Sequence, residues 1–254
     1  MSSKSVAVVG VTGAVGQEML DVLAARDFPL SNLRPLASER SAGKTVQFRG
    51  EEIPIEVLGD DSFAGVDLAL FSAGASISRE YAPVAVDAGA VVVDNSSAFR
   101  MDPAIPLVVP EVNSDAIAAH QGIIANPNCS TIIMVVALQP IHELSALTRV
   151  VVSTYQAASG AGAKGMDALR RELSGEELED SPFPHRLAGN LVPRIDVVQD
   201  NGYTKEEMKM VLETRKIMGL EGIPISATCV RVPVERAHSE SIQVSTESPL
   251  ELDA

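Results

Sequence analysis

Cys129 is the residue whose surroundings most favour covalent chemistry. It stands in Ala125-Asn-Pro-Asn-Cys-Ser-Thr131, directly before an apolar segment that is expected to be a helix. At the start of a helix, backbone N–H groups and the helix dipole stabilise the thiolate, which is the reactive form of the side chain. Position alone leaves a buried structural cysteine as the alternative. Cys229 lies within the β-rich run Ala227-Thr-Cys-Val-Arg-Val232, where packing in the core is favoured.

A nucleophilic thiol needs an acid/base partner, and the chain contains four histidines. His142 lies on the same predicted helix as Cys129, about 20 Å away at about 1.5 Å per residue, which excludes a hydrogen bond between them. His120 and His185 fall in polar segments typical of a surface. His238, just after a predicted strand, is the preferred base, with a purely structural histidine as the alternative.

A glycine-rich turn near the start of the chain is typical of a dinucleotide-binding site. The strand Ser5–Val9 leads into Gly10-Val-Thr-Gly13-Ala-Val-Gly16 and then into a helical pattern ending at Ala25. Glycines let the backbone approach a pyrophosphate, which the helix N-terminus then binds. The spacing is G-x-x-G-x-x-G rather than G-x-G-x-x-G, and an ordinary βα turn is the alternative.

The residues after the second predicted strand favour NADP over NAD. An acidic residue at this position usually binds the ribose 2′-hydroxyl of NAD, whereas an arginine suits a 2′-phosphate. Here the strand runs into Ala37-Ser-Glu-Arg-Ser41, in which hydroxyl side chains lie on both sides of the Glu39-Arg40 pair. Arg40 and Ser41 are therefore predicted to bind the 2′-phosphate, while Glu39 leaves NAD open.

The elements that position these residues predict an α/β fold. Strand runs alternating with helical patterns through residues 1–125 indicate a mostly parallel, doubly wound, Rossmann-type sheet covered on both faces. Residues 126–254 are predicted to form an α/β (α+β) catalytic domain. The strand runs of the first part are expected at 5–9, 32–37, 45–48, 53–57, 66–71, 90–93 and 107–109.

The second part has fewer and longer elements. Thr204 is predicted to be the N-cap of a helix that ends at Met218, with acidic residues in its first turn. We expect a further helix at 131–144, strands at 148–156, 226–234 and 241–246, a glycine-rich turn at 159–165 that leads to another helix, and a surface loop at 175–189.

Composition limits the possible partners. Of the 254 residues 46% are hydrophobic and 21% charged, which is typical of a globular protein that needs no disulfide or metal to stabilise its core. Thirty-four acidic against 20 basic residues give a net charge of −14, which disfavours nucleic acid and anionic membranes. We found no membrane-spanning run and no signal peptide, so a cytoplasmic location, two reduced thiols and no metal site are expected.

Four segments resemble one enzyme family. Asn126–Thr131, Tyr155–Gly162, Thr204–Lys209 and Arg231-Val-Pro-Val-Glu-Arg-Ala-His-Ser239 resemble the motifs of aspartate-β-semialdehyde dehydrogenases, in the same order along the chain. The resemblance implies a dinucleotide domain followed by a catalytic and dimerisation domain, and a homodimer. It also implies reversible, NADP-dependent conversion of L-aspartyl-4-phosphate to L-aspartate-4-semialdehyde, in the synthesis of lysine, threonine, methionine and isoleucine.

The resemblance also implies roles for individual residues. Cys129 would be the thioester nucleophile and His238 the acid/base, while Gln156 would orient the substrate. Arg231 would bind the substrate carboxylate and Glu206 its ammonium group. Phosphate would be held by Arg100 and Lys209, and the cofactor would be contacted by Thr12, Gly13, Ala14, Val15, Arg40, Ser41, Ser159 and Gly160, beside the turn glycines Gly10 and Gly16.

The residue pattern supports some of these roles independently. Strand alternation places Arg231 on the opposite face from Val230, and a guanidinium can bind a carboxylate through two parallel hydrogen bonds. Glu206 and Lys209 are three residues apart on one helix and share a face. Without the resemblance, a solvated ion pair within that helix is the preferred interpretation.

Three other classes of protein remain as alternatives, and the sequence departs from the family pattern in its length. N-acetyl-glutamyl-phosphate reductases and glyceraldehyde-phosphate dehydrogenases use the same cysteine and histidine chemistry, and a nucleotide-binding homologue without turnover is a third possibility. Family chains continue through further strands and a last helix, whereas this sequence stops at Ala254. We therefore expect a C-terminally truncated chain with a partial catalytic domain, poor solubility and little activity.

Overall fold

The computed structural model describes residues 2–251 and divides the chain into two compact units. The first contains the chain up to Val108 and the segment Asp115–Pro127, and the second contains Val109–Ser114 and the chain from Asn128 onward. The short helix α3 (Pro110–Asn113) packs against α4 and α6 of the second unit, so the chain enters that unit briefly before its main crossing.

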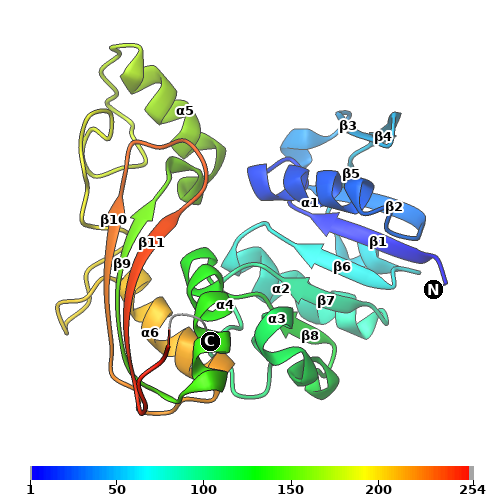
Figure 1. Ribbon diagram of the computed structural model, residues 1–254. Coiled ribbons are helices and arrows are strands. Elements are labelled where there is room, and N and C mark those ends of the chain that lie inside the picture. The colour runs from blue at the N-terminus through cyan, green and yellow to red at the C-terminus, as the bar shows by residue number, and fades with distance from the viewer. Residues whose placement is uncertain (1, 252–254) are drawn as a thin grey trace. The chain divides into compact units, whose positions relative to one another are not determined.

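The first unit is built on a six-stranded parallel sheet (Figure 1). The strands lie in the order β5 (Glu56–Val57), β2 (Leu30–Ala37), β1 (Lys4–Val9), β6 (Leu68–Phe71), β7 (Val91–Asp94) and β8 (Ile123–Ala125). In sequence order this is 3-2-1-4-5-6, the order of a Rossmann-type sheet, so the predicted fold class is confirmed.

Helices cover both faces of this sheet because the residues of its central strand alternate between two cores. Val6 and Val8 of β1 pack with α1 (Ala14–Ala25), whereas Ala7 and Val9 join the cluster that contains α2 (Ala75–Asp87). All four side chains are fully buried. A strand buried on both faces explains the continuous apolar run in the sequence.

Two predicted strands differ from the structure. The run 53–57 is divided between β4 (Glu51–Pro54), which forms a hairpin with β3 (Thr45–Phe48), and β5 in the large sheet. The run 107–109 forms only an isolated bridge between Leu107 and Ala125. Prolines at positions 106 and 110 flank it and cannot donate ladder hydrogen bonds, so β8 becomes the edge strand instead. Short 3-10 helices occur at η1 (Glu39–Ser41), η2 (Asp60–Phe63) and η3 (Ser114–Ala119).

The second unit contains a three-stranded sheet with two helices packed on one face. β9 (Leu147–Gln156) lies between β10 (Ile225–Arg231), to which it is parallel, and β11 (Ser239–Thr246), to which it is antiparallel. α4 (Cys129–Leu144) and α6 (Lys205–Met218) contribute the core side chains Met134, Leu138 and Met210 against this sheet. α4 runs through Pro140 rather than ending there.

A smaller cluster lies beyond β9 in the same unit. The 3-10 helix η4 (Ala158–Ala161) leads into α5 (Gly162–Leu173), whose Leu169 packs with Phe183 of the following loop. The loop is held by the buried Glu172 carboxylate, which accepts hydrogen bonds from the backbone N–H groups of Leu187 and Ala188 at 2.7 and 2.9 Å. Within residues 2–251, no helix has the length and apolar character needed to span a membrane.

Candidate active site

Cys129 is the first residue of α4, where a thiolate is best stabilised. Asn128 is the N-cap, and its side-chain oxygen accepts hydrogen bonds from the N–H groups of Ser130 and Thr131 at 3.0 and 3.2 Å. The apolar pattern predicts a helix that begins at Thr131, but α4 begins two residues earlier. The Asn128 side chain satisfies the N–H groups of the first turn and so fixes the earlier start. Cys129 is exposed, unlike a core cysteine. An exposed thiol at the start of a 16-residue helix is suited to nucleophilic attack.

Asn128 also ties the start of α4 to α6. Its backbone N–H donates to Glu213 Oε2 at 2.6 Å, and its side-chain amide donates to Glu206 Oε1 at 2.8 Å. Asn128, Glu206 and Glu213 are all buried. The position of the thiol is therefore fixed by carboxylates from a segment about 80 residues later in the chain.

Glu206 is the centre of this polar network. Its Oε1 also accepts from Gln156 Nε2 at 3.0 Å, and its Oε2 accepts from Lys209 Nζ at 2.9 Å. Burial by itself would raise the pKa of Glu206, but the Lys209 charge and the hydrogen bonds from Gln156 and Asn128 lower it below its usual value. Glu206 is thus a buried carboxylate that stays ionised and holds Gln156 beside the start of α4.

Lys209 is shared between two carboxylates. Besides Glu206 it donates to Asp196 Oδ2 at 3.1 Å. Burial would lower the pKa of Lys209, but Glu206 and Asp196 together raise it above its usual value. The intrahelical ion pair expected from the sequence is present, yet its carboxylate is buried rather than solvated.

The α6 start confirms the predicted cap. Thr204 Oγ1 accepts from the Glu207 N–H at 3.3 Å, and Glu207 Oε2 accepts from the Thr204 N–H at 2.7 Å. This reciprocal pair is a capping box, which fixes where the helix begins. It thereby places Glu206 and Lys209 in the first turns of α6.

Arg231 ends β10 directly beside Gln156 of β9 in the sheet register. Its guanidinium is buried and donates from Nη1 to the Ala157 carbonyl oxygen at 2.6 Å. Burial lowers the pKa of Arg231, while negative charge at Glu206 and Cys129 opposes this shift. The guanidinium therefore lies within electrostatic reach of the thiol and of the Glu206 network.

His238 joins the same group through Ala157. Its Nδ1 accepts a hydrogen bond from the Ala157 N–H at 3.0 Å. Because Nδ1 is the acceptor, the proton of the neutral ring is on Nε2. Burial and the Arg231 charge lower the pKa of His238, with Glu206 acting in the opposite direction. The ring is thus held neutral, with its Nε2–H available to donate a hydrogen bond.

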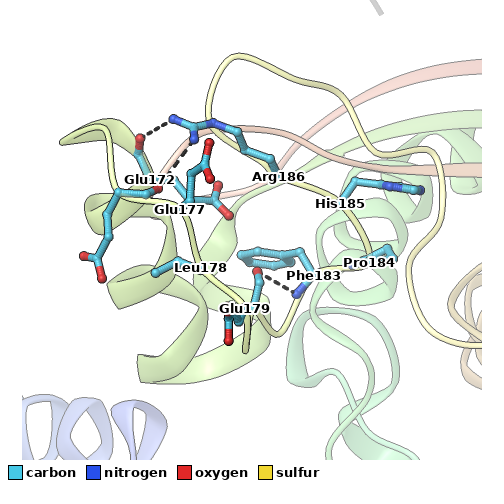
Figure 2. A pocket seen from close by; sticks show the side chains of 10 residues that line it. Glu172, Glu177, Leu178, Glu179, Phe183, Pro184, His185 and Arg186 are labelled. Carbon is cyan, nitrogen blue, oxygen red and sulfur yellow. Dashed lines mark hydrogen bonds between the residues drawn. The ribbon is translucent and has the colours of Figure 1, made fainter.

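The other histidines and the second cysteine have local roles. His142 Nδ1 accepts from the Leu147 N–H and His120 Nδ1 from the Gly122 N–H, at 3.1 and 3.0 Å. His185 lines a surface pocket between α5 and the following loop (Figure 2). Cys229 is fully buried, and burial raises the pKa of its thiol to about 12, so it is a core residue as predicted.

The first unit contains the glycine turn, at the carboxyl ends of β1 and β6. A Cβ on Gly10 would lie 2.8 Å from the Ser72 carbonyl oxygen, and one on Gly16 would lie 2.4 Å from the Gly10 oxygen. Gly10 also has a φ of +85°, and Gly13 is the N-cap of α1. The turn sits where the strand order reverses, the usual place for a dinucleotide in such sheets, and its lack of side chains fits a pyrophosphate.

The remaining predicted cofactor and phosphate residues lie at the start of α1, after strands of the first unit, and in η4 of the second unit. Arg40 and Ser41 are in η1 after β2, with Arg40 exposed and Ser41 buried. Thr12, Ala14 and Val15 surround the α1 start. Arg100 is buried, and its Nη2 donates to the Asn95 carbonyl oxygen at 3.0 Å. Ser159 and Gly160 lie in η4 of the second unit, beside Ala157.

The structure thus brings six of the predicted site residues together in the second unit: Cys129, Gln156, Glu206, Lys209, Arg231 and His238. Sequence reasoning missed four residues that hold them, namely Asn128, Ala157, Asp196 and Glu213. An Asn directly before a predicted helix was the one available signal, since Asn is a preferred N-cap. The other three act through backbone groups or long-range pairs that leave no local pattern.

Family models match both parts of the chain. A model described as "Semialdehyde dehydrogenase, NAD binding domain" matches residues 5–120, and one described as "Semialdehyde dehydrogenase, dimerisation domain" matches residues 138–254. The aspartate-semialdehyde dehydrogenase of Synechocystis is 53% identical over 252 residues, which cover 98% of this chain and 75% of that protein. The Bacillus subtilis enzyme of the same name is 52% identical, over 94% of this chain and 72% of that protein.

Solved structures agree with these matches. A Vibrio cholerae aspartate semialdehyde dehydrogenase II complexed with ASA has a TM-score of 0.96 and 48% identity, over 100% of this chain and 77% of that one. A Candida albicans aspartate semialdehyde dehydrogenase with NADP has a TM-score of 0.72 and 26% identity, over 98% of this chain and 73% of that one. This chain spans about three quarters of the relatives it matches. On the strength of these matches in both units, the chain belongs to the aspartate-semialdehyde dehydrogenase family of enzymes.

Proposed function

We propose that this chain interconverts L-aspartyl-4-phosphate and L-aspartate-4-semialdehyde through a thioester on Cys129. The observation that carries the proposal is the network of Asn128, Glu206 and Gln156, which fixes the thiol at the start of α4. The same unit holds Arg231 and His238 through one peptide group. The bound ASA in the Vibrio cholerae relative supports the choice of substrate.

The covalent steps follow from these positions. The Cys129 thiolate attacks the acyl carbon of aspartyl phosphate, a C–S bond forms, and the bond from that carbon to the phosphate oxygen breaks. NADPH, when bound, supplies the hydride that reduces the thioester carbonyl. His238 donates a hydrogen bond from Nε2–H to the oxygen that becomes negative. When that oxygen re-forms the carbonyl, the C–S bond breaks, which regenerates the thiolate and releases the aldehyde.

Arg231 and the α6 residues bind the ends of the substrate. A buried guanidinium is suited to the α-carboxylate, and Glu206 Oε2 has lone pairs left for an ammonium group beside Lys209. Lys209 and Arg100 are the candidates for phosphate. Gln156, held by Glu206 and accepting from Thr154 Oγ1 at 3.0 Å, is placed to orient the acyl group.

We assign NADP as the cofactor because of Arg40. Among residues 2–251, Arg40 forms no ion pair, and its exposed guanidinium follows β2, where a ribose 2′-substituent lies in Rossmann-type sheets. The matched domain is described for NAD binding in general, and the Candida albicans structure contains NADP. Ser41, Thr12 and the Gly10–Gly16 turn complete the proposed cofactor site.

We infer a homodimer formed through the second unit. The matching model is a dimerisation domain, and the sheet face opposite α4 and α6 exposes Tyr155 at 47%. A second copy of this chain would cover that face. Light scattering on a size-exclusion column checks this, and a monomer at micromolar concentration contradicts it.

One assay tests the proposed activity. The natural protein that carries these residues should oxidise aspartate semialdehyde in a reaction that requires both NADP and phosphate, followed by the absorbance of NADPH. N-acetyl-glutamate semialdehyde should be a poor substrate. Absence of turnover with aspartate semialdehyde, or equal turnover of the two aldehydes, would contradict the proposal.

A further inference from the structure

Arg231 is a buried cation without a direct ion pair among the described residues. Its side chain belongs to a residue that is only 7% exposed, and the ion pairs found within residues 2–251 do not include it. A buried charge without a counter-ion is costly, so something must hold the guanidinium in place until an anion arrives.

Three groups surround the guanidinium. The Ala157 carbonyl oxygen accepts from Nη1 at 2.6 Å. The Phe183 ring lies under the guanidinium carbon, 5.9 Å from the ring centroid. Gly160 lies close as well, since a Cβ there would lie 2.6 Å from Nη1. These three groups form what we call the Arg231 box.

The loop that carries Phe183 is itself anchored to Arg231. The backbone N–H of Arg231 donates to the Val192 oxygen at 2.9 Å, and the Val192 N–H donates to the Arg231 oxygen at 3.0 Å. Closer to Phe183 the loop is tied to α5, where Arg186 Nη2 donates to the Glu172 carbonyl oxygen at 2.6 Å (Figure 2). The loop that carries Phe183, labelled in Figure 2, is therefore held to both α5 and Arg231.

We propose that Gly160 and Phe183 are positioning residues that set the Arg231 guanidinium for a substrate carboxylate. This inference rests on the proposed function. The φ of Gly160 is not in the left-handed region, so its backbone conformation does not require glycine. Glycine is required because a Cβ at this position would lie too close to the Arg231 guanidinium. The three atoms that its Cβ would meet all belong to Arg231. Phe183 supplies a ring face on which a planar guanidinium can lie.

An ordinary packing role makes different predictions. Phe183 also belongs to the cluster with Leu169 and Leu187, so its replacement loosens a core whatever it does for Arg231. A packing role predicts lost stability without a selective effect on one substrate. A positioning role predicts a rise in the KM for aspartate semialdehyde.

The first test is Gly160→Ala in the natural protein. The added methyl should displace the guanidinium and raise the KM for aspartate semialdehyde at least tenfold. Because Gly160 is also a predicted cofactor contact, the control is an Arg231→Lys background and not the KM for NADP. In an Arg231→Lys background the guanidinium atoms that the methyl would meet are absent. Gly160→Ala should therefore change the KM for aspartate semialdehyde less than twofold in that background. This non-additivity separates displacement of Arg231 from a general fault.

The second test is Phe183→Leu, with Leu169→Ala as its matched control. Both remove apolar contacts from one cluster, but only Phe183 touches Arg231. Phe183→Leu should raise the KM for aspartate semialdehyde about three- to tenfold, whereas Leu169→Ala should lower the melting temperature and leave that KM within twofold.

The outcomes can be told apart. If wild-type protein does not turn over aspartate semialdehyde, the proposed function fails, and this inference fails with it. If wild type is active and Gly160→Ala weakens NADP alone, acts equally in both backgrounds or does not fold, Gly160 does not position Arg231. If Leu169→Ala raises the KM as much as Phe183→Leu, Phe183 is a packing residue and the inference is wrong.

Discussion

Glu240 gives a quantitative prediction about the pH dependence of stability. It lies on β11 opposite Thr154, which is itself opposite Cys229 on β10, so the three side chains form one row on the buried face of the sheet. Both carboxylate oxygens are buried without a hydrogen-bond partner among the described residues. Burial raises the pKa of Glu240 from 4.5 to about 7. Below about pH 7 the native protein therefore holds this carboxyl mainly as the neutral acid.

The direction in which the free energy of unfolding changes with pH follows from the number of protons bound by the native and unfolded states. Between pH 4.5 and about 7 the native state keeps a proton on Glu240 that the unfolded chain has lost. The contribution of Glu240 to the free energy of unfolding should therefore be highest below this range, fall as pH rises through it, and become constant above it. A shift of one pKa unit corresponds to about 1.4 kcal/mol, so the shift from 4.5 to about 7 gives a fall of at most about 3.5 kcal/mol. Residual solvent access reduces it to about 1–2 kcal/mol.

Glu240→Gln should remove this slope. The amide does not titrate, so the difference in unfolding free energy between wild type and variant should change by about 1–2 kcal/mol from pH 5 to pH 8, in the variant's favour at the higher pH. Urea titrations at four pH values measure it, and Glu221→Gln, at an exposed position, controls for the loss of one carboxylate. Parallel profiles for wild type and Glu240→Gln would refute the reasoning.

Four further outcomes follow from the site. Cys129→Ser should reduce turnover by at least about three orders of magnitude while NADP binding persists, because a serine hydroxyl is barely ionised; steady-state kinetics and cofactor titration check it. His238→Asn should lower kcat by about 10²- to 10⁴-fold with a smaller change in KM, and unchanged activity would exclude it as the base. Arg40→Ala should raise the Kd for NADP and leave that for NAD within about twofold, since only a 2′-phosphate contact is lost; equal weakening of both would mean a more general role. Asn128→Ala should slow alkylation of Cys129 at neutral pH and lower stability by about 1–2 kcal/mol, because the cap and the Glu206 hydrogen bond are both lost.

Local sequence signals predicted the elements that carry the site. Thr204 with Glu207 three residues later predicts a helix start, and the structure has that capping box. The glycines at 10, 13 and 16 follow a strand fully buried on both faces, and the turn has the close backbone approaches that exclude side chains. In each case the physical cause lies within one or two turns of the chain, so the pattern is visible without a fold.

The same logic explains where sequence analysis placed boundaries wrongly. Apolar periodicity predicts that α4 begins at Thr131, whereas the cap formed by the Asn128 side chain lets the helix begin at Cys129. The apolar run predicts a strand that reaches Val234, but β10 ends at Arg231. Val232 still donates a hydrogen bond to the Gln156 oxygen, and Pro233 then interrupts the ladder because it has no N–H. Runs of apolar residues predict that a strand exists better than where it ends.

Local sequence patterns do not predict which side chains pair with each other in the site. Glu206 and Lys209 alone predict a solvated ion pair, and in the helix they do pair. The pair becomes part of a site because two distant segments converge on it. Asn128 and Gln156 both donate hydrogen bonds to Oε1 of the buried Glu206. No spacing in the sequence encodes that convergence, because it depends on α4, α6 and β9 packing together. The resemblance supplied the residues, and only the structure shows why one carboxylate must stay ionised for the thiol to keep its place.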